Sequence, residues 1–254
     1  MGLKVAIGGI LHERWTVPAH LEAMWALNTT GLNVVHVWVL DGSVPSVWED
    51  SRAPLSRKLL SSLPGRNYDR TSLTQPSERR AVYGRLATLR NMLADEALRL
   101  GADFLLSVDS DILPPPETLM RLLGAAQPWC AALVRNSATD PRCWNVFRLR
   151  RVDTDGGLVS HFLPCGNGAR GESWPNSAGA GWDPRDPKQE RDLAAGACCL
   201  YSADLLRKTR WATDHRGRQE DVGFALSAFA AGYRAWYLPI VCQHLTVDGD
   251  GLGE

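Results

Sequence analysis

The sequence contains no apolar stretch long enough to cross a lipid bilayer. Its longest apolar runs, such as residues 34–40, fall far short of the roughly 20 residues that a membrane-spanning helix requires. Residues 1–10 hold one lysine and a Gly-Gly pair, without a long apolar core or a small-residue cleavage site, so we expect no signal peptide. We therefore expect a cytoplasmic protein without a membrane anchor.

An excess of either charge is also missing, because 28 lysines and arginines balance 28 aspartates and glutamates. A net charge of zero argues against capture of the whole protein by nucleic acid or by an anionic membrane. Two local basic clusters are nevertheless present: Arg142, Arg148, Arg150 and Arg151, and then Arg207, Lys208, Arg210, Arg216 and Arg218. They are either solvated surface or a contact for a phosphate backbone, which keeps a DNA partner open.

The six cysteines form no CxxC pair and no zinc-binding spacing. We expect free thiols in a reducing compartment rather than a disulfide framework. The 254 residues, 44% of them hydrophobic, are enough to bury a sizeable core. This composition excludes a wholly disordered chain.

The first half of the chain alternates predicted strands with predicted helices. Apolar runs and helical periodicity predict strands at residues 3–7, 32–40 and 104–108 and helices at 16–31 and 77–100. A tight turn is expected at Gly8-Gly9, directly after the first strand. Such alternation indicates an α/β domain with a parallel sheet.

The second half is predicted to contain more strands and fewer helices. We expect strands at 129–134, 143–149, 233–238 and 240–245, the last two separated by Pro239, and a helix at 219–231. Residues 50–75 are polar and rich in Ser, Arg and Pro, and we expect a long loop or a partly ordered excursion there. Residues 166–191 are dominated by Gly, Pro, Ser, Asn and Trp without periodicity, and we expect a long, mobile surface loop.

Two carboxylates follow the buried strand at 104–108. Asp109 and Asp111 are two positions apart, so on extended backbone both side chains point to the same side. Ligands of open α/β sheets bind at the carboxyl ends of the strands, where this pair would stand. Its oxygens suit Mg²⁺ or Mn²⁺ together with phosphate. The alternative is an aspartate that caps the next helix.

Further candidates lie near the C-terminus. Glu220 and Asp221 open the predicted helix at 219–231, where the helix dipole stabilises carboxylates. They are either ordinary capping residues or a general base. His244 is either a hydrogen-bonded core residue or, as a neutral imidazole, a further ligand for Mn²⁺.

The order of these features resembles that of the metal-dependent GT-A glycosyltransferases, with family-2-like and Anp1-like members the most similar. Three stretches carry the resemblance: LRNMLADEALRLGADFLLSVDSDILPPPETL, AAGACCLYSADLLRKT and QEDVGFALSAFAAGYRAWYLPIVCQH. The resemblance implies a single GT-A catalytic domain over residues 1–254, with a Rossmann-like, mainly parallel central sheet flanked by helices. Residues 1–111 would form the nucleotide-binding half, and residues 112–254 a smaller, mixed-strand acceptor-binding half.

The resemblance also implies roles for individual residues. Asp111 would bind the metal that bridges the donor diphosphate, and His244 would be the last metal ligand. Asp109 would contact the metal or the nucleotide ribose. Arg90 would lie on the diphosphate side of the pocket.

The other implied roles concern the acceptor, the sugar and the base. Asp221, with Glu220 as the alternative, would be the catalytic carboxylate that faces the acceptor hydroxyl. Gly196-Ala197 would form the floor of the sugar site, and Gly8-Gly9 would lie near the nucleobase.

The implied function is transfer of a sugar from a UDP- or GDP-linked donor to a hydroxyl acceptor, with Mn²⁺ or Mg²⁺ as cofactor. The acceptor would be a glycan, a small molecule or a hydroxymethylated DNA base. Both inverting and retaining outcomes stay open. Two alternatives are a sugar nucleotidyltransferase and a non-catalytic nucleotide-sugar-binding protein on the same fold.

Overall fold

The computed structural model of the chain describes residues 2–11, 16–41, 56–60, 76–134, 146–154, 157–164, 189–191, 193–194, 196–213 and 219–245. The helices are α1 (Val17–Trp25), α2 (Pro76–Arg99), α3 (Thr118–Gly124), α4 (Ala203–Lys208) and α5 (Glu220–Ala230). The strands are β1 (Lys4–Leu11), β2 (Asn33–Leu40), β3 (Ser56–Leu60), β4 (Phe104–Val108), β5 (Ile112–Leu113), β6 (Trp129–Val134), β7 (Val146–Thr154), β8 (Gly157–Pro164), β9 (Gln189–Arg191), β10 (Leu193–Ala194), β11 (Cys198–Ser202) and β12 (Ala235–His244).

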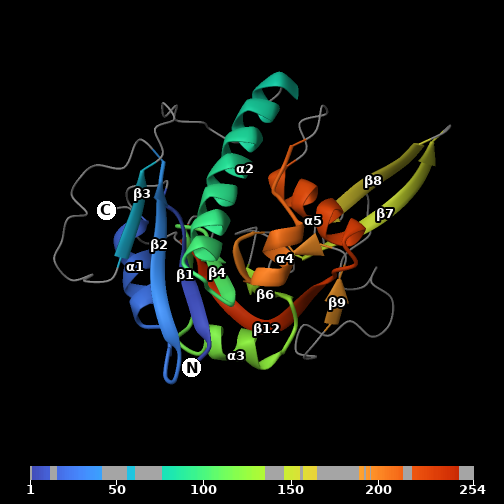
Figure 1. Cartoon of the computed structure of the whole chain (residues 1–254). Helices are drawn as coiled ribbons and strands as arrows, with labels where there is room; N and C mark the ends of the chain where they lie inside the picture. Colours follow the sequence, from blue (N-terminus) through green and yellow to red (C-terminus); the bar gives the residue numbers. More distant parts are fainter. Residues whose placement is uncertain are drawn as a thin grey trace.

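A nine-stranded sheet forms the centre of this structure (Figure 1). Its strand order is β3-β2-β1-β4-β11-β6-β12-β5, and β9 also pairs with β12. The strands β3, β2, β1 and β4 are parallel. Beyond β4 the directions mix, because β11 lies antiparallel between β4 and β6, and β12 is parallel to β6 but antiparallel to β5 and β9. The expectation of a mainly parallel sheet therefore holds for the first half only, and the sheet as a whole is mixed.

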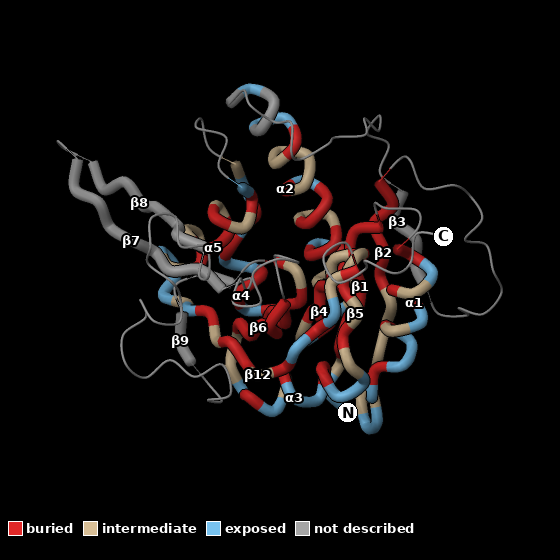
Figure 2. The backbone as a smooth tube through the Cα atoms, turned by 180° about the vertical axis from the view of Figure 1, so that it is seen from behind, coloured by how far each residue is buried: buried red, intermediate tan, exposed pale blue. Residues whose placement is uncertain are grey.

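Helices cover both faces of this sheet. Because successive side chains of a strand point to opposite faces, Ala6 and Ile10 of β1 join a core cluster with α2, α4 and α5. Val5, Ile7 and Leu11 join a second cluster with α1 and α3. Figure 2 shows the central strands as a continuous buried region. A strand covered on both faces reads as an unbroken apolar run, and this is why β1, β2 and β4 could be found in the sequence.

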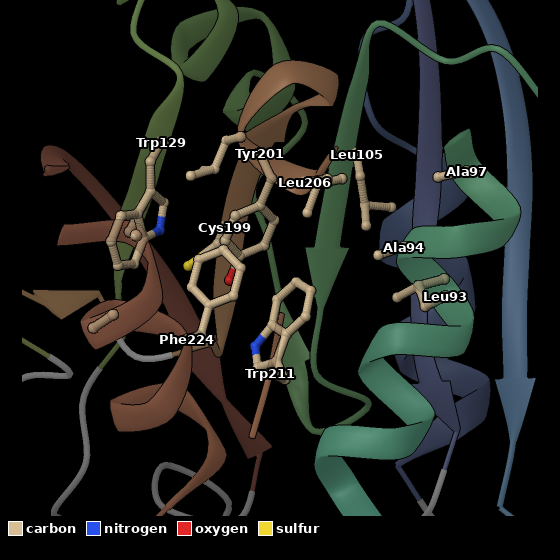
Figure 3. Close-up of a cluster of buried hydrophobic side chains, with 14 of the residues drawn as sticks. Leu93, Ala94, Ala97, Leu105, Trp129, Cys199, Tyr201, Leu206, Trp211 and Phe224 are labelled. Atoms are coloured by element: carbon tan, nitrogen blue, oxygen red, sulfur yellow. The ribbon is translucent and has the colours of Figure 1, made fainter. Parts of the chain in front are cut away.

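A group of aromatic rings lies in the first cluster around Phe224 of α5 (Figure 3). Trp211 stacks on Phe224 of α5 with a centroid distance of 4.2 Å, and Tyr201 of β11 meets both rings edge-on. Trp129 of β6 packs edge-on against Phe224 at 5.3 Å. These contacts fix α5, and with it the acidic residues of its first turn, to the central strands.

The turn predicted at Gly8-Gly9 is wrong, because β1 continues through both glycines to Leu11. Instead, the two glycines allow the backbone of β1 to lie close to the backbones of its neighbours β2 and β4. A Cβ on Gly8 would lie 1.6 Å from the carbonyl oxygen of Val37 in β2. A Cβ on Gly9 would lie 2.0 Å from the carbonyl oxygen of Val108 in β4. Only glycine fits between neighbouring backbones at such distances.

The predicted break at Pro239 is also wrong. β12 runs unbroken from Ala235 to His244, with a register shift against β6 between Tyr237 and Val241. The proline lies inside this irregularity, where its missing N–H costs no regular ladder hydrogen bond. Residues 50–75, where we expect a long loop or a partly ordered excursion, contain β3, which pairs in parallel with β2.

Other predictions concern the remaining segments. The helices predicted at 77–100 and 219–231 are confirmed as α2 and α5. Most of the loop predicted at 166–191 lies outside the described residues. Four cysteines, Cys130, Cys198, Cys199 and Cys242, are buried free thiols as expected. In the part of the chain that the structure describes, no helix has both the length and the apolarity needed to span a membrane.

Candidate functional site

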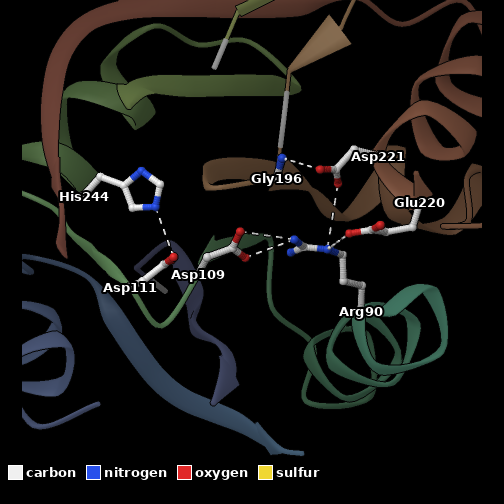
Figure 4. A network of polar contacts seen from close by, with 7 residues as sticks. All are labelled: Arg90, Asp109, Asp111, Gly196, Glu220, Asp221 and His244. Atoms are coloured by element: carbon white, nitrogen blue, oxygen red, sulfur yellow. Dashed lines mark hydrogen bonds and ion pairs between the residues drawn. The ribbon is translucent and has the colours of Figure 1, made fainter. Parts of the chain in front are cut away.

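The predicted polar residues converge at the carboxyl end of β4 (Figure 4). The strand directions explain this convergence: β11 is antiparallel to β4, so its preceding residues lie at this edge, and β12 ends at the same edge. The backbone N–H of Asp109 donates to the carbonyl of Ala197 at 2.9 Å. A turn follows, in which the N–H of Ile112 donates to the carbonyl of Asp109 at 3.0 Å. The acidic triplet Asp109-Ser110-Asp111 is thus anchored at its first residue to the segment before β11.

Arg90, in the middle of α2, contacts three carboxylates. Its Nη2 donates to both carboxylate oxygens of Asp109, at 3.0 and 3.3 Å. Its Nε lies 3.3 Å from Oε1 of Glu220 and 3.8 Å from Oδ1 of Asp221. Burial alone would lower the pKa of Arg90, but the three carboxylates raise it above its ordinary value. The guanidinium therefore stays charged and joins acidic residues that are far apart in the sequence.

Glu220 and Asp221 have different environments. The Glu220 side chain is only 6% exposed, and burial together with the charge of Asp221 raises its pKa to about 7 against the opposing effect of Arg90. Asp221 is 16% exposed, and its Oδ2 accepts a hydrogen bond of 2.9 Å from the N–H of Gly196. Glu220 is thus a buried partner of Arg90, whereas Asp221 is oriented by two groups and is nearer to solvent.

Gly196 lies directly against the two charged groups. A Cβ at this position would be 2.8 Å from Nη2 of Arg90 and 2.8 Å from Oδ1 of Asp221. Any larger residue would displace at least one of these groups. Gly196 and Ala197 therefore link the acidic triplet to α5 through their backbone, because Ala197 bonds to Asp109 and Gly196 bonds to Asp221.

Asp111 and His244 form a second contact beside this network. Nε2 of His244 lies 3.1 Å from Oδ2 of Asp111, and both side chains are partly exposed. Backbone pairing brings them together, because His244 is the β12 partner of Ile112, and the N–H of Leu245 donates to the carbonyl of Asp111 at 2.8 Å.

A divalent cation such as Mn²⁺ needs oxygen or nitrogen donors that lie close together. No group of three or more His, Cys, Asp and Glu side chains among the described residues is arranged to hold a metal ion. Asp109 is directed to Arg90, which leaves Asp111 and His244 as an oxygen and a nitrogen donor in contact. Such a pair fits Mn²⁺, whose other positions water and phosphate oxygens would fill.

Other predicted residues lie at or beyond the margin of the site. Gly9 packs against the carbonyl of Val108, the residue before Asp109, and Gly8 packs against β2. Their contact with a nucleobase stays a prediction. The predicted contact of Arg90 with a diphosphate also stays a prediction, since its described partners are carboxylates.

The basic clusters are described only in part. Lys208 pairs with Asp204 and Arg210 pairs with Asp95, each at 2.9 Å. Residues 142, 216 and 218 lie outside the described residues, and for the three arginines of β7 the structure describes the backbone alone. Two cations of the second cluster, Lys208 and Arg210, are thus paired with carboxylates at the surface.

Sequence reasoning missed the support behind α5. Nδ2 of Asn91 donates to the carbonyl of Trp211 at 2.9 Å, and the N–H of Trp211 donates to Oδ1 of Asn91 at 3.1 Å. A Cβ on Gly223 would lie 1.9 Å from the carbonyl oxygen of Ala212, so the first turn of α5 rests directly on this segment. Gly223 could have indicated this contact in the sequence. A glycine inside a helix destabilises it by about 1 kcal/mol relative to alanine, so its presence suggests that another segment packs closely there.

No protein-family model matches the sequence. No curated protein matches it either. Solved structures do share its architecture. The crystal structure of GalNAc-T7 with UDP, GalNAc and Mn²⁺ matches with a TM-score of 0.60 and 12% identity, over 96% of this chain and 44% of that one. The structure of S. aureus TarS 1–349 in complex with UDP matches with a TM-score of 0.53 and 13% identity, over 95% of this chain and 60% of that one.

Both of these proteins are GT-A-type glycosyltransferases. This chain shares the GT-A fold. The fold expected from the sequence resemblance is therefore confirmed at the level of its class. The chain spans less than two thirds of the length of either structure.

Proposed function

We propose that the chain is a metal-dependent glycosyltransferase that moves a sugar from a nucleoside-diphosphate sugar to a hydroxyl acceptor. The observation that carries the proposal is the meeting of Arg90, Asp109 and Asp221 beside the Asp111–His244 pair at the carboxyl end of β4. In α/β sheets this edge is where ligands bind. The fold supports the proposal, because both matched structures contain UDP.

Asp111 and His244 would hold the divalent cation, Mn²⁺ or Mg²⁺. A cation bound there would act as a Lewis acid toward the departing diphosphate. Asp109 would face the cation or the nucleotide ribose, with its orientation set by the two hydrogen bonds from Arg90. In this proposal Arg90 works through the carboxylates that it contacts.

Asp221 would be the general base. It is more exposed than Glu220, and its carboxylate is oriented by the N–H of Gly196 and by Arg90. It would take the proton of the acceptor hydroxyl as that oxygen attacks the sugar. Attack in line with the breaking bond inverts the configuration of the product. Glu220 would hold Arg90 in place rather than react.

We propose a glycan or small-molecule hydroxyl as the acceptor. We do not extend the proposal to DNA, because two of the three described cations of the second basic cluster, Lys208 and Arg210, are paired with carboxylates. Binding to a DNA backbone relies on cations that are available to neutralise phosphates.

A thermal-shift panel tests the proposal. The protein is heated with UDP, GDP, CDP or dTDP, each with Mn²⁺ and with EDTA. A nucleotide that binds the native state at 100 times its Kd adds about 2.7 kcal/mol of stability, so we expect a higher Tm with one nucleotide and Mn²⁺ that EDTA abolishes.

Two variants sharpen this experiment. Asp111→Asn should lose the Mn²⁺-dependent shift, whereas Asp95→Asn, which changes an exposed carboxylate of α2, should retain it. A shift that is equal in EDTA would favour a nucleotide-binding protein that needs no cation. No shift with any nucleotide would contradict the proposed donor site.

A further inference from the structure

His20 is a buried polar residue in an apolar helix face. Val17, Leu21 and Met24 of α1 are buried at helical spacing, and His20 is fully buried in the same stripe. Its Nδ1 lies 2.8 Å from the carbonyl oxygen of Ile112 in β5. Since a carbonyl only accepts, Nδ1 carries the proton and Nε2 has the lone pair.

The surroundings keep the ring in this one state. Burial lowers the pKa of His20 to about 4, so the imidazole is neutral near pH 7. The ring meets the indole of Trp38 edge-on, with centroids 5.7 Å apart. Its Nε2 is buried and has no hydrogen-bond partner in the part of the chain that the structure describes. A buried nitrogen without a partner costs about 1–3 kcal/mol, which an apolar side chain would avoid.

Ile112, the hydrogen-bond partner of His20, is linked directly to both residues of the Asp111–His244 pair. Ile112 directly follows Asp111 and is the strand partner of His244. Any movement of Ile112 would therefore move both residues of the Asp111–His244 pair. The other side of this turn is held by the bond from Leu245 N–H to the Asp111 carbonyl.

We propose that His20 is a positioning residue for the divalent-cation site. Its Nδ1–H holds the Ile112 carbonyl from the α1 side and so sets Asp111 against His244. The proposal rests on the proposed function, because it concerns the cation that these two residues would bind.

Three variants separate positioning from stability. In His20→Asn the amide N–H takes the place of Nδ1–H and can still donate to Ile112. In His20→Gln the amide reaches the place of Nε2, and the bond to Ile112 is lost. Met24→Ala weakens the same buried face of α1 by truncating a side chain that is 1% exposed. It leaves the hydrogen bond to Ile112 in place.

The measurement is the Kd of Mn²⁺ for the full chain, from the paramagnetic resonance signal of free Mn²⁺, with and without UDP. The Tm of each variant is recorded alongside. We expect His20→Gln to raise the Kd about 10-fold, the scale seen when groups that support metal ligands are removed. His20→Asn should bind close to the original protein, and Met24→Ala should lower the Tm without changing the Kd.

Each contrary result has its own meaning. Unchanged binding in His20→Gln would overturn the positioning role. So would a Kd that follows the Tm across all three variants, or a loss in His20→Asn as large as in His20→Gln while both remain folded. If the unaltered protein binds no Mn²⁺ even with UDP, the proposed cation site fails, and the inference fails with it.

Discussion

Nη2 of Arg90 lies 3.0 Å from Oδ1 of Asp109, so the middle of α2 is tied to the first residue of the acidic turn after β4. The same guanidinium contacts Glu220 and Asp221 at the start of α5. One side chain from the first half of the chain therefore fixes carboxylates from both halves. Removing either the guanidinium of Arg90 or the carboxylate of Glu220 would leave the other as a buried charge without its partner, which is strongly unfavourable.

Arg90→Met should destabilise the protein by about 3–5 kcal/mol, because it leaves carboxylates without their buried counter-charge. Urea unfolding measures the loss. Arg210→Met is the matched control, because Arg210 pairs with Asp95 of α2 and both side chains are more than half exposed, where ion pairs contribute little. Equal losses in the two variants would contradict a central role for Arg90.

Gly196→Ala should weaken nucleotide binding and lower stability by about 1–3 kcal/mol, the usual cost of overpacking. The added methyl would meet Arg90 and Asp221 at 2.8 Å, so one of them must move. Gly124→Ala in α3 is the control, because a Cβ there has no neighbour within 4 Å. Unfolding midpoints and the Mn²⁺-dependent shift with the nucleotide check both effects. A Gly196→Ala protein that matches the control would show that the site tolerates bulk.

The parts of the site that could be predicted from the sequence are local. An apolar strand followed by Asp109 and Asp111 is visible in a short window, and so is a helix that opens with two acids. The partners of Arg90 are not visible, because Asp109 is 19 and Glu220 is 130 positions away, and spacing says nothing of such pairing. The insertion of β11 between β4 and β6 is equally non-local, and it alone makes the sheet mixed at this point.

The wrong predictions have a shared physical origin. Glycine suits both a tight turn and a close approach of two backbones, and the Gly8-Gly9 pair follows an apolar run in either case. Only the folded structure, in which the carbonyl oxygens of Val37 and Val108 lie directly against the two glycines, shows that they serve the close approach of strands. Proline likewise ends a regular strand or lies at an irregular point of one, and the register shift in β12 is a property of its pairing with β6.

Asp221→Asn should reduce sugar transfer by about 10²–10⁴-fold, the contribution of a general base, while nucleotide binding persists. Glu220→Gln should retain more activity, because this side chain contacts Arg90 and is less exposed. The thermal-shift panel identifies the nucleoside diphosphate that binds. The rate of its release from the corresponding sugar donor measures the activity of both variants. A larger loss in Glu220→Gln, at equal stability, would assign the base to Glu220 instead.

Stability should depend on pH through His20. Its pKa is about 4 in the native state and 6.5 ordinarily, so between these values the unfolded chain binds more protons. The free energy of unfolding must then fall as the pH falls from 6.5 toward 4, by about 1.4 kcal/mol for each pH unit from this group. Unfolding curves of the original protein and His20→Asn over this range measure the contribution as the difference between them.

Glu220 should act in the opposite direction. Its native pKa of about 7 lies above its ordinary 4.5, so the native state binds the extra proton and stability from this group is lost as the pH rises from 4.5 to 7. Glu220→Gln removes that loss and should make the total fall of stability on acidification steeper than in the original protein. His20→Asn should make it shallower. A change of the slope in the same direction by both substitutions would contradict the opposite pKa shifts of His20 and Glu220 in this structure.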